Sequence, residues 1–238
     1  MHALGENGLS NAILYITRNK RMKENQKVKY YSPMEERINI GSHALGFILS
    51  VIALFLLIRH ASFNGSGLHI ISFSIFGISL ILLYAASTFY HRAKSPELRS
   101  RLRVFDHATI YILIAGTYTP FALITLKGEL GWIVFGLSWS MALVGVILKL
   151  FFTGKYNLIS TLMYVFMGWM IIFFISPLMA SLSAEGLTWL TAGGISYTVG
   201  AALYSIKKIP FNHAIFHVFV LLGSAAHFVS VYFYVLPI

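Results

Sequence analysis

Seven long apolar stretches constrain the fold of this chain more than any other feature. They cover approximately Ile38–Ile58, Leu68–Tyr90, Val104–Leu126, Leu130–Phe152, Asn157–Ala180, Gly186–Ile206 and Ile209–Leu236. Each has the roughly 20 residues that a helix needs to cross a bilayer. Because a backbone in hydrocarbon must satisfy its own hydrogen bonds, each stretch is predicted to be helical. The expected fold is an all-α integral membrane protein, a seven-transmembrane helix bundle.

Composition supports a membrane protein and narrows the kinds of site it can carry. Of 238 residues, 57% are hydrophobic and 11% are charged, against roughly 25% charged in an average soluble domain. Cysteine is absent, which excludes a disulfide framework and a thiolate metal site. Any metal must therefore be held by His, Asp, Glu or backbone groups.

The basic residues predict the orientation of the bundle. If the segment before the first span faces the cytoplasm, all but two of the 18 Lys and Arg residues lie on that side. The exceptions are Arg59 and Lys127. Such a bias is typical of cytoplasmic loops, so the N-terminus is expected in the cytoplasm and the C-terminus outside. In a membrane chain, the net charge of +10 indicates this bias rather than nucleic-acid binding.

The same features predict the domain organisation and location. Residues 1–34 are expected to form a polar, basic, mobile cytoplasmic tail, and residues 35–238 the transmembrane domain. No export signal is visible in the sequence. We therefore expect a multi-pass protein of the cell inner (plasma) membrane.

Several polar residues are predicted to meet at one depth. The second span runs inward, which places Ser87 and His91 at its cytoplasmic end. The third and seventh spans begin inside, which places Asp106, His213 and His217 at the same level. The orientation was derived from charge alone, so this agreement with the positions of the polar residues is informative.

The spacing and types of these residues indicate a metal site. His213 and His217 are four residues apart, hence on one helix face. Asp106 is the only acidic residue within any span, and a lone carboxylate there is costly unless it is paired or near a metal. Three neutral histidines leave the fourth position of Zn²⁺ open, as catalytic zinc requires. A single histidine in a span more often bonds a neighbouring helix, and Ser87 could simply bond its own backbone.

Three further histidines within the spans are weaker candidates. His107 points about 100° away from Asp106 around the helix, which favours packing or a supporting contact next to the ligands. His43 lies near Glu36 and Asn39 and could either bond the ligands or only pack. His227 lies about 20 Å further out than His213, where a hydrogen bond within the bundle is expected and a polar path leading outward is the alternative.

Six segments make the sequence resemble a known family. They are "EERINIGSH", "LLYAASTFYH", "FDHATIYILIAGTYTPF", "YVFMGW", "GGISYTVGAALY" and "HAIFHVFVLLGSAAHF". In order, these resemble the motifs of the hemolysin III family, the bacterial branch of the progestin and adipoQ receptor family, itself similar to alkaline ceramidases. The resemblance runs from about Glu35 to the C-terminus.

The resemblance implies a seven-helix bundle with a zinc ion near the cytoplasmic face. The zinc ligands of the family map onto His91, His213 and His217. Its aspartate and serine near the metal, which often contact it through water, map onto Asp106 and Ser87. Asp106 is therefore both a candidate metal ligand, directly or through water, and a candidate catalytic residue.

The leading hypothesis is a zinc-dependent hydrolase of lipid amide or ester bonds, or a lipid sensor built on the same site. In the hydrolase, Asp106 would hold the water and accept its proton, and Ser87 would donate a hydrogen bond to the developing oxyanion. The expected partners are the lipid bilayer and its lipids: fatty acyl amides or esters, or a free fatty acid. Nucleic acid is not expected, and the sequence specifies no oligomeric state.

Two alternatives come from other functional classes. The family name points to a pore-forming cytolysin, but the spans show no repeated polar stripe that would line a wide channel. A non-catalytic receptor with a structural zinc is the other, and an open coordination position argues mildly against it.

Overall fold

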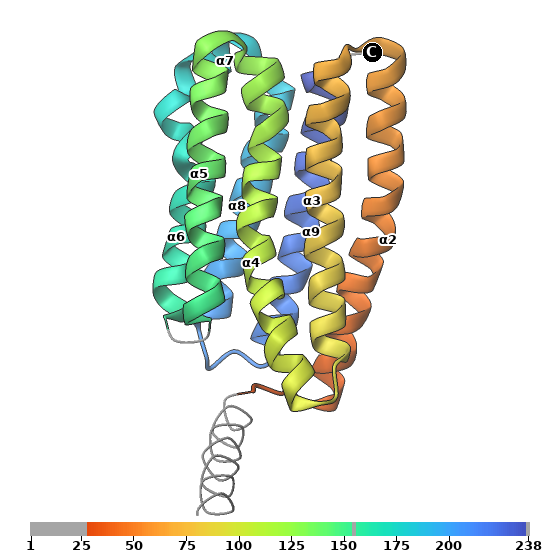
Figure 1. Ribbon diagram of the computed structural model, residues 1–238, viewed down its shortest axis with the longest axis vertical. Coiled ribbons are helices and arrows are strands. Elements are labelled where there is room, and N and C mark those ends of the chain that lie inside the picture. Colours follow the sequence, from red (N-terminus) through yellow and green to blue (C-terminus); the bar gives the residue numbers. More distant parts are fainter. Residues whose placement is uncertain (1–27, 154–155, 237–238) are drawn as a thin grey trace, which may run out of the picture.

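A computed structural model describes residues 28–153 and 156–236, and most of the predicted tail, residues 1–27, lies outside this part of the chain. The described residues form helices and short connections, without strands. Seven helical segments run along the bundle (Figure 1). They are α2 (Pro33–Asn64), α3 (Gly67–Arg92), α4 (Pro96–Pro120) with the π-helical η1 (Phe121–Leu126), α5 (Gly128–Phe152), α6 (Asn157–Trp169) with the 3-10 η2 (Met170–Phe174) and α7 (Ile175–Ser181), α8 (Ala184–Ser205), and α9 (Asn212–Ser230) with the π-helical η3 (Val231–Val235). The predicted all-α membrane fold is confirmed.

Six of these segments are long and apolar enough to cross a membrane within the described residues. The seventh, α8, has 22 residues and would extend about 33 Å at 1.5 Å per residue, enough for a hydrocarbon core of about 30 Å. It is less apolar because it is rich in Gly, Ser and Thr. Those small residues matter for packing: Gly186, Gly193 and Gly200 are its buried positions.

Local sequence signals explain where several helices begin. Ser32 precedes Pro33, and its hydroxyl accepts a hydrogen bond from the backbone N–H of Glu35. Ser95 precedes Pro96 and accepts in the same way from Leu98. A serine before a proline in the first turn is a strong start signal, because the side chain satisfies a free N–H and proline needs none.

The fifth membrane segment is broken in its middle, and a neighbouring helix supplies the missing hydrogen bonds. Here α6 gives way to η2, and α7 follows with Pro177 inside it. The Tyr118 hydroxyl of α4 lies 3.0 Å from the Met167 carbonyl oxygen and 2.9 Å from that of Gly168. It also accepts from the N–H of Ile171 at 2.9 Å. A break buried in protein is tolerated for this reason.

The packing order brings three helix ends together. α2 packs on α3 and α9, α3 packs on α4, and α8 packs on α9. The last turn of α3 and the first turns of α4 and α9 therefore lie at the same end of the bundle, the lower end in Figure 1. The candidate site is at this end.

Candidate metal centre

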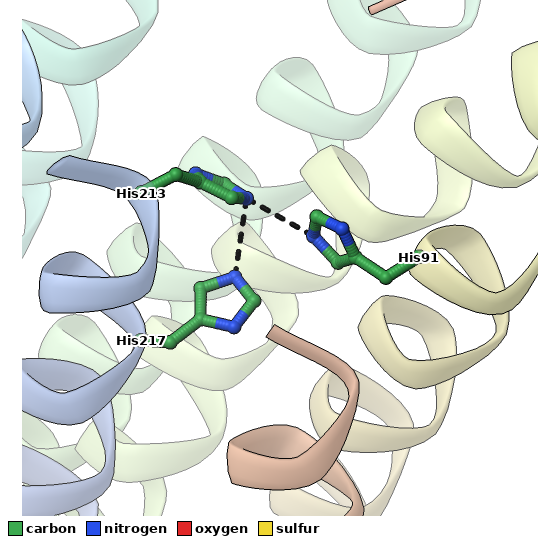
Figure 2. Close-up of side chains that lie close together, drawn as sticks. All are labelled: His91, His213 and His217. Atoms are coloured by element: carbon green, nitrogen blue, oxygen red, sulfur yellow. Dashed lines mark hydrogen bonds between the residues drawn. The ribbon is translucent and has the colours of Figure 1, made fainter. Parts of the chain in front are cut away.

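Three buried histidines from two helices point their Nε2 atoms at one another (Figure 2). The Nε2 atom of His213 is 3.0 Å from that of His91 and 3.2 Å from that of His217. His91 comes from the last turn of α3, and the other two come from α9. We call these three residues the histidine triad. Their side chains form the group that could hold a metal ion in the described part of the chain.

The start of α9 is fixed by an unusual backbone and an asparagine. Phe211 adopts a left-handed conformation with φ 55°, which turns the chain sharply before the helix. The Asn212 side chain donates hydrogen bonds to the carbonyls of Tyr204 at 2.8 Å and Ile206 at 3.3 Å. These bonds tie the first turn of α9 to the end of α8. The backbone at His213 is therefore held in a fixed position.

The outer nitrogen of His91 is held by an acidic residue of α2. Its Nδ1 lies 2.7 Å from Oε2 of Glu36. A carboxylate only accepts, so the proton is on Nδ1 and the lone pair of Nε2 faces the triad. This is the arrangement by which carboxylates commonly orient metal-binding histidines. Nδ1 of His217 has a weaker partner, the hydroxyl of Ser42 at 3.4 Å.

Arg99 is a buried cation that secures both Glu36 and the end of α3. Only 1% of it is exposed, and it forms an ion pair with Glu36. Its Nη1 donates to the carbonyls of Tyr90, His91 and Ala93 at 3.1 to 3.4 Å. A cation at a helix C-terminus satisfies free carbonyls and complements the helix dipole. Arg99 therefore fixes the backbone of His91 and the carboxylate that orients its ring.

Two aromatic rings cover the triad. His43 stacks on His217 with ring centroids 3.5 Å apart, which resolves its role as a packing partner. Tyr31, in the segment before α2, stacks on His213 at 4.6 Å with the rings almost parallel. Burial raises the pKa of the Tyr31 hydroxyl far above its ordinary value. The Tyr31 ring therefore covers the triad as a neutral phenol.

Asp106 and Ser87 lie beside the triad rather than within it. Asp106 is not part of the group of three metal-binding candidates in the described residues. It lines a cavity together with Ser87, His213 and His217. The Ser87 hydroxyl is near enough to interact with the Asp106 carboxylate, although it has no fully formed hydrogen bond within the described residues. Both side chains therefore face the space next to the triad.

The cavity extends from the triad through the centre of the bundle and has a volume of about 230 Å³. Its walls come mainly from α4, α6, α7, α8 and α9, with single residues or pairs from α2, α3 and α5, and they are mainly apolar. Along α4 and into the start of η1 it runs from Asp106 to Phe121, about 22 Å at 1.5 Å per residue. That length exceeds half of a hydrocarbon core of about 30 Å, so the cavity is long enough for an acyl chain of one leaflet.

His107 and His227 lie along the cavity, outside the triad. His227 contacts the Leu190 carbonyl of α8 through Nε2 at 3.1 Å, the kind of bond within the bundle that was expected. Nε2 of His107 lies 3.9 Å from Oδ2 of Asp106. That distance is too long for a hydrogen bond but close enough for the two side chains to influence each other.

Sequence comparison assigns the chain to a family. Residues 31–228 match the family described as Haemolysin-III related. The chain belongs to this family. "Hemolysin-3" of Bacillus cereus is 48% identical over 203 residues, which cover 85% of this chain and 93% of that protein. "Hemolysin-3 homolog" of Bacillus subtilis (strain 168) is 49% identical over 200 residues, covering 84% and 94%.

A more distant haemolysin-III relative comes from animals. "Monocyte to macrophage differentiation factor" of Homo sapiens is 31% identical over 169 residues, 67% of this chain and 68% of that protein. The resemblance drawn from the motifs is thus confirmed. Family membership and six apolar helices together establish a multi-pass membrane protein.

The candidate metal centre includes residues that the sequence did not single out. Tyr31, Ser42 and Arg99 all contact the triad or its supports. From the sequence, Arg99 contributes only to the cytoplasmic excess of positive charge. One signal in the sequence points to its role. Arg99 lies three residues after Pro96, in the first turn of a helix that closely follows the helix of His91, so it can reach the end of that helix.

Proposed function

We propose that this protein is a zinc-dependent hydrolase of lipid amide or ester bonds. The observation that carries the proposal is the convergence of three buried imidazoles at one end of an apolar cavity that also holds Asp106 and Ser87. The triad offers a metal site, the two polar side chains offer proton transfer, and the cavity offers a place for an acyl chain. These are the parts that hydrolysis of a lipid linkage requires.

The residues present fit zinc. Tetrahedral zinc with Zn–N bonds of 2.0–2.1 Å places ligand nitrogens about 3.3 Å apart, and two of the Nε2 pairs are separated by 3.0 and 3.2 Å. Lone pairs that face one another at this distance repel unless a cation or a shared proton lies between them. Three imidazole nitrogens are also a ligand set that catalytic zinc sites use.

The side chains around the triad have distinct tasks in this reaction. Bound zinc would polarise the substrate carbonyl and lower the pKa of water from roughly 15.7 to about 7. Asp106 would hold the attacking water and accept its proton. Ser87 would donate a hydrogen bond to the oxyanion that develops. Glu36 and Arg99 would keep His91 in position, and the apolar walls would exclude bulk water.

Replacing Asp106 tests the chemistry. Wild-type protein in detergent would be offered short-chain lipid amides and esters, alongside Asp106→Asn and the control Glu129→Gln, which removes an exposed carboxylate at the opposite end of the bundle. Turnover should fall by at least about 100-fold in Asp106→Asn, the usual contribution of a general base, and stay unchanged in the control. Absence of wild-type turnover on every substrate would overturn the hydrolase and leave lipid sensing at the same site.

A second candidate, cytolysis, is favoured by the names of the bacterial relatives. It would require the protein to insert into a foreign membrane and make it permeable. Release of dye from lipid vesicles on addition of purified protein, compared with detergent alone, would support it. Dye retention by the vesicles would oppose it.

A further inference from the structure

A lysine is buried at the inner end of the cavity, and it has no acidic partner among residues 28–153 and 156–236. Lys149, near the C-terminal end of α5, is 3% exposed and lines the same cavity as Asp106. None of the ion pairs in the described residues includes it. Arg103 adds a second positive charge nearby. A buried cation is costly when no anion compensates it. Binding of an anionic group beside Lys149 would therefore be favourable.

The immediate contacts of Lys149 leave part of its hydrogen-bonding capacity free. The ammonium carries three N–H donors, and within the described part of the chain it has one acceptor, the Ser160 hydroxyl at 2.5 Å. That hydroxyl in turn donates to the Tyr156 carbonyl at 2.9 Å. Ser160 is thereby oriented toward Lys149 by α6, and both side chains line the cavity.

A chain of contacts joins Lys149 to the candidate catalytic residues. The ammonium lies 5.7 Å from the centre of the Tyr164 ring. The Tyr164 hydroxyl donates to the His107 carbonyl at 2.9 Å, and the His107 side chain lies next to Asp106. A ligand group at Lys149 would therefore be a few side chains away from the triad, within the same cavity.

We propose that Lys149 and Ser160 bind the anionic headgroup, phosphate or carboxylate, of a lipid whose acyl chain occupies the apolar part of the cavity. Lys149 lies at the end of the bundle predicted to face the cytoplasm, where the headgroups of the inner leaflet are found. The rest of the cavity is apolar and extends away from this end. The arrangement matches an amphiphile with its charge at the membrane surface. The inference rests on the proposed function in one respect: it names the substrate class of that reaction.

A binding experiment tests the headgroup site without any need for turnover. Protein in the neutral detergent dodecyl maltoside would receive dodecyl phosphate, zwitterionic dodecyl phosphocholine or inorganic phosphate, and Tm would be recorded. Dodecyl phosphate should raise the Tm of the wild type and of Lys149→Arg, but not of Lys149→Gln. The control Lys208→Gln, which removes an exposed charge at the same end, should respond like the wild type.

Several outcomes would overturn the headgroup site. One is an equal response of Lys149→Gln and the wild type to dodecyl phosphate. Another is a full response to inorganic phosphate at the same concentration, which would mean a site for free anions rather than a lipid. If Lys149→Gln does not fold, Ser160→Ala replaces it in the comparison and should show a weakened response.

A kinetic comparison separates this inference from the proposed function. For a monoacylglycerol phosphate, kcat/KM of Lys149→Gln should fall about 10- to 100-fold, the size expected for a lost hydrogen bond to a charged group. For the uncharged monoacylglycerol with the same chain it should stay within about two-fold. Equal losses on both would overturn the headgroup site and leave the hydrolase intact. Binding that depends on Lys149 in an inactive wild type would overturn the hydrolase alone.

Discussion

The orientation of His91 depends on Glu36, 55 residues earlier in the chain, and on Arg99, eight residues later. Glu36 fixes the protonated nitrogen of the ring, and Arg99 fixes both Glu36 and the backbone carbonyl of His91. Removing one member of such a buried network leaves another charge without its partner, which costs more than the single bond that is lost. The metal-binding geometry is therefore a property of the network and not of three histidines alone.

The triad should bind one zinc ion per chain, and His217→Ala should lose it. Two imidazoles and a hydrated ion would face an apolar interior in this variant. Asp106→Asn should keep the metal, since Asp106 lies outside the triad. The measurement is elemental analysis of purified protein, with thermal unfolding before and after a chelator.

A matched control is His69→Ala, which removes a histidine from the other end of α3 and should leave the zinc content unchanged. Complete loss of metal in Asp106→Asn would identify Asp106 as a direct ligand and contradict the role given to it here.

Glu36→Gln should weaken zinc binding without abolishing it. The amide can still contact His91, but it no longer carries the charge that increases the basicity of the ring. Loss of such a supporting contact typically reduces metal affinity about 10- to 100-fold. Competition with a chromogenic chelator would measure this affinity.

Glu35→Gln removes the same charge from the same turn of α2 without touching His91, so its zinc affinity should equal that of the wild type. An equal loss of zinc affinity in both variants would mean that the net charge at this end of the bundle matters, and not the contact with His91.

Close packing of α8 on α9 positions the helix that carries His213 and His217. A Cβ atom at Gly193 would lie 2.1 Å from Cδ2 of His227, and one at Gly200 would lie 2.7 Å from Cβ of Phe219. Small residues at such positions let two membrane helices approach closely. The carbonyls of α8 are then within reach of α9 side chains, as in the contact between His227 and Leu190.

Gly193→Ala should therefore destabilise the protein, and the adjacent Gly194→Ala should not. Overpacking of this kind costs roughly 1–3 kcal/mol. At Gly194 the nearest atom to a new Cβ is 3.6 Å away, on Trp169, so the change should be neutral or stabilising through helix propensity. Thermal unfolding of both variants in detergent gives the comparison, and equal Tm values would contradict the packing argument.

The central cavity of the molecule has one polar end and one apolar end. The triad, Asp106 and Lys149 lie at the end where most basic residues gather, and the cavity becomes apolar toward α7. A lipid from the inner leaflet could thus present its linkage to the triad while its chain stays inside the bundle.

The predicted orientation, with the N-terminus in the cytoplasm and the C-terminus outside, can be tested with reporter fusions. Alkaline phosphatase fused after Ile238 should be active, because it folds only outside the cytoplasm. The same reporter inserted between Lys207 and Lys208 should be inactive. The reversed pattern would place the triad at the outer face and remove the case for an inner-leaflet substrate.

The sequence by itself determined the class of fold and the meeting point of the main polar residues. Long apolar stretches can only be helices in hydrocarbon, and the positions of Arg and Lys set their directions. Together these two signals place His91, Asp106 and His213 at one depth. Such one-dimensional signals are strong because the membrane reduces the possible arrangements to a few.

Only the tertiary structure decided which side chains touch. The stacking of Tyr31 on His213 and the bonds of Arg99 depend on the rotation of each helix about its own axis and on the path of the connections. Burial of Lys149 beside Ser160 likewise depends on how α5 and α6 meet. Hydropathy carries no information on rotation or packing partners, because contacts between membrane helices arise from the fit of individual side chains.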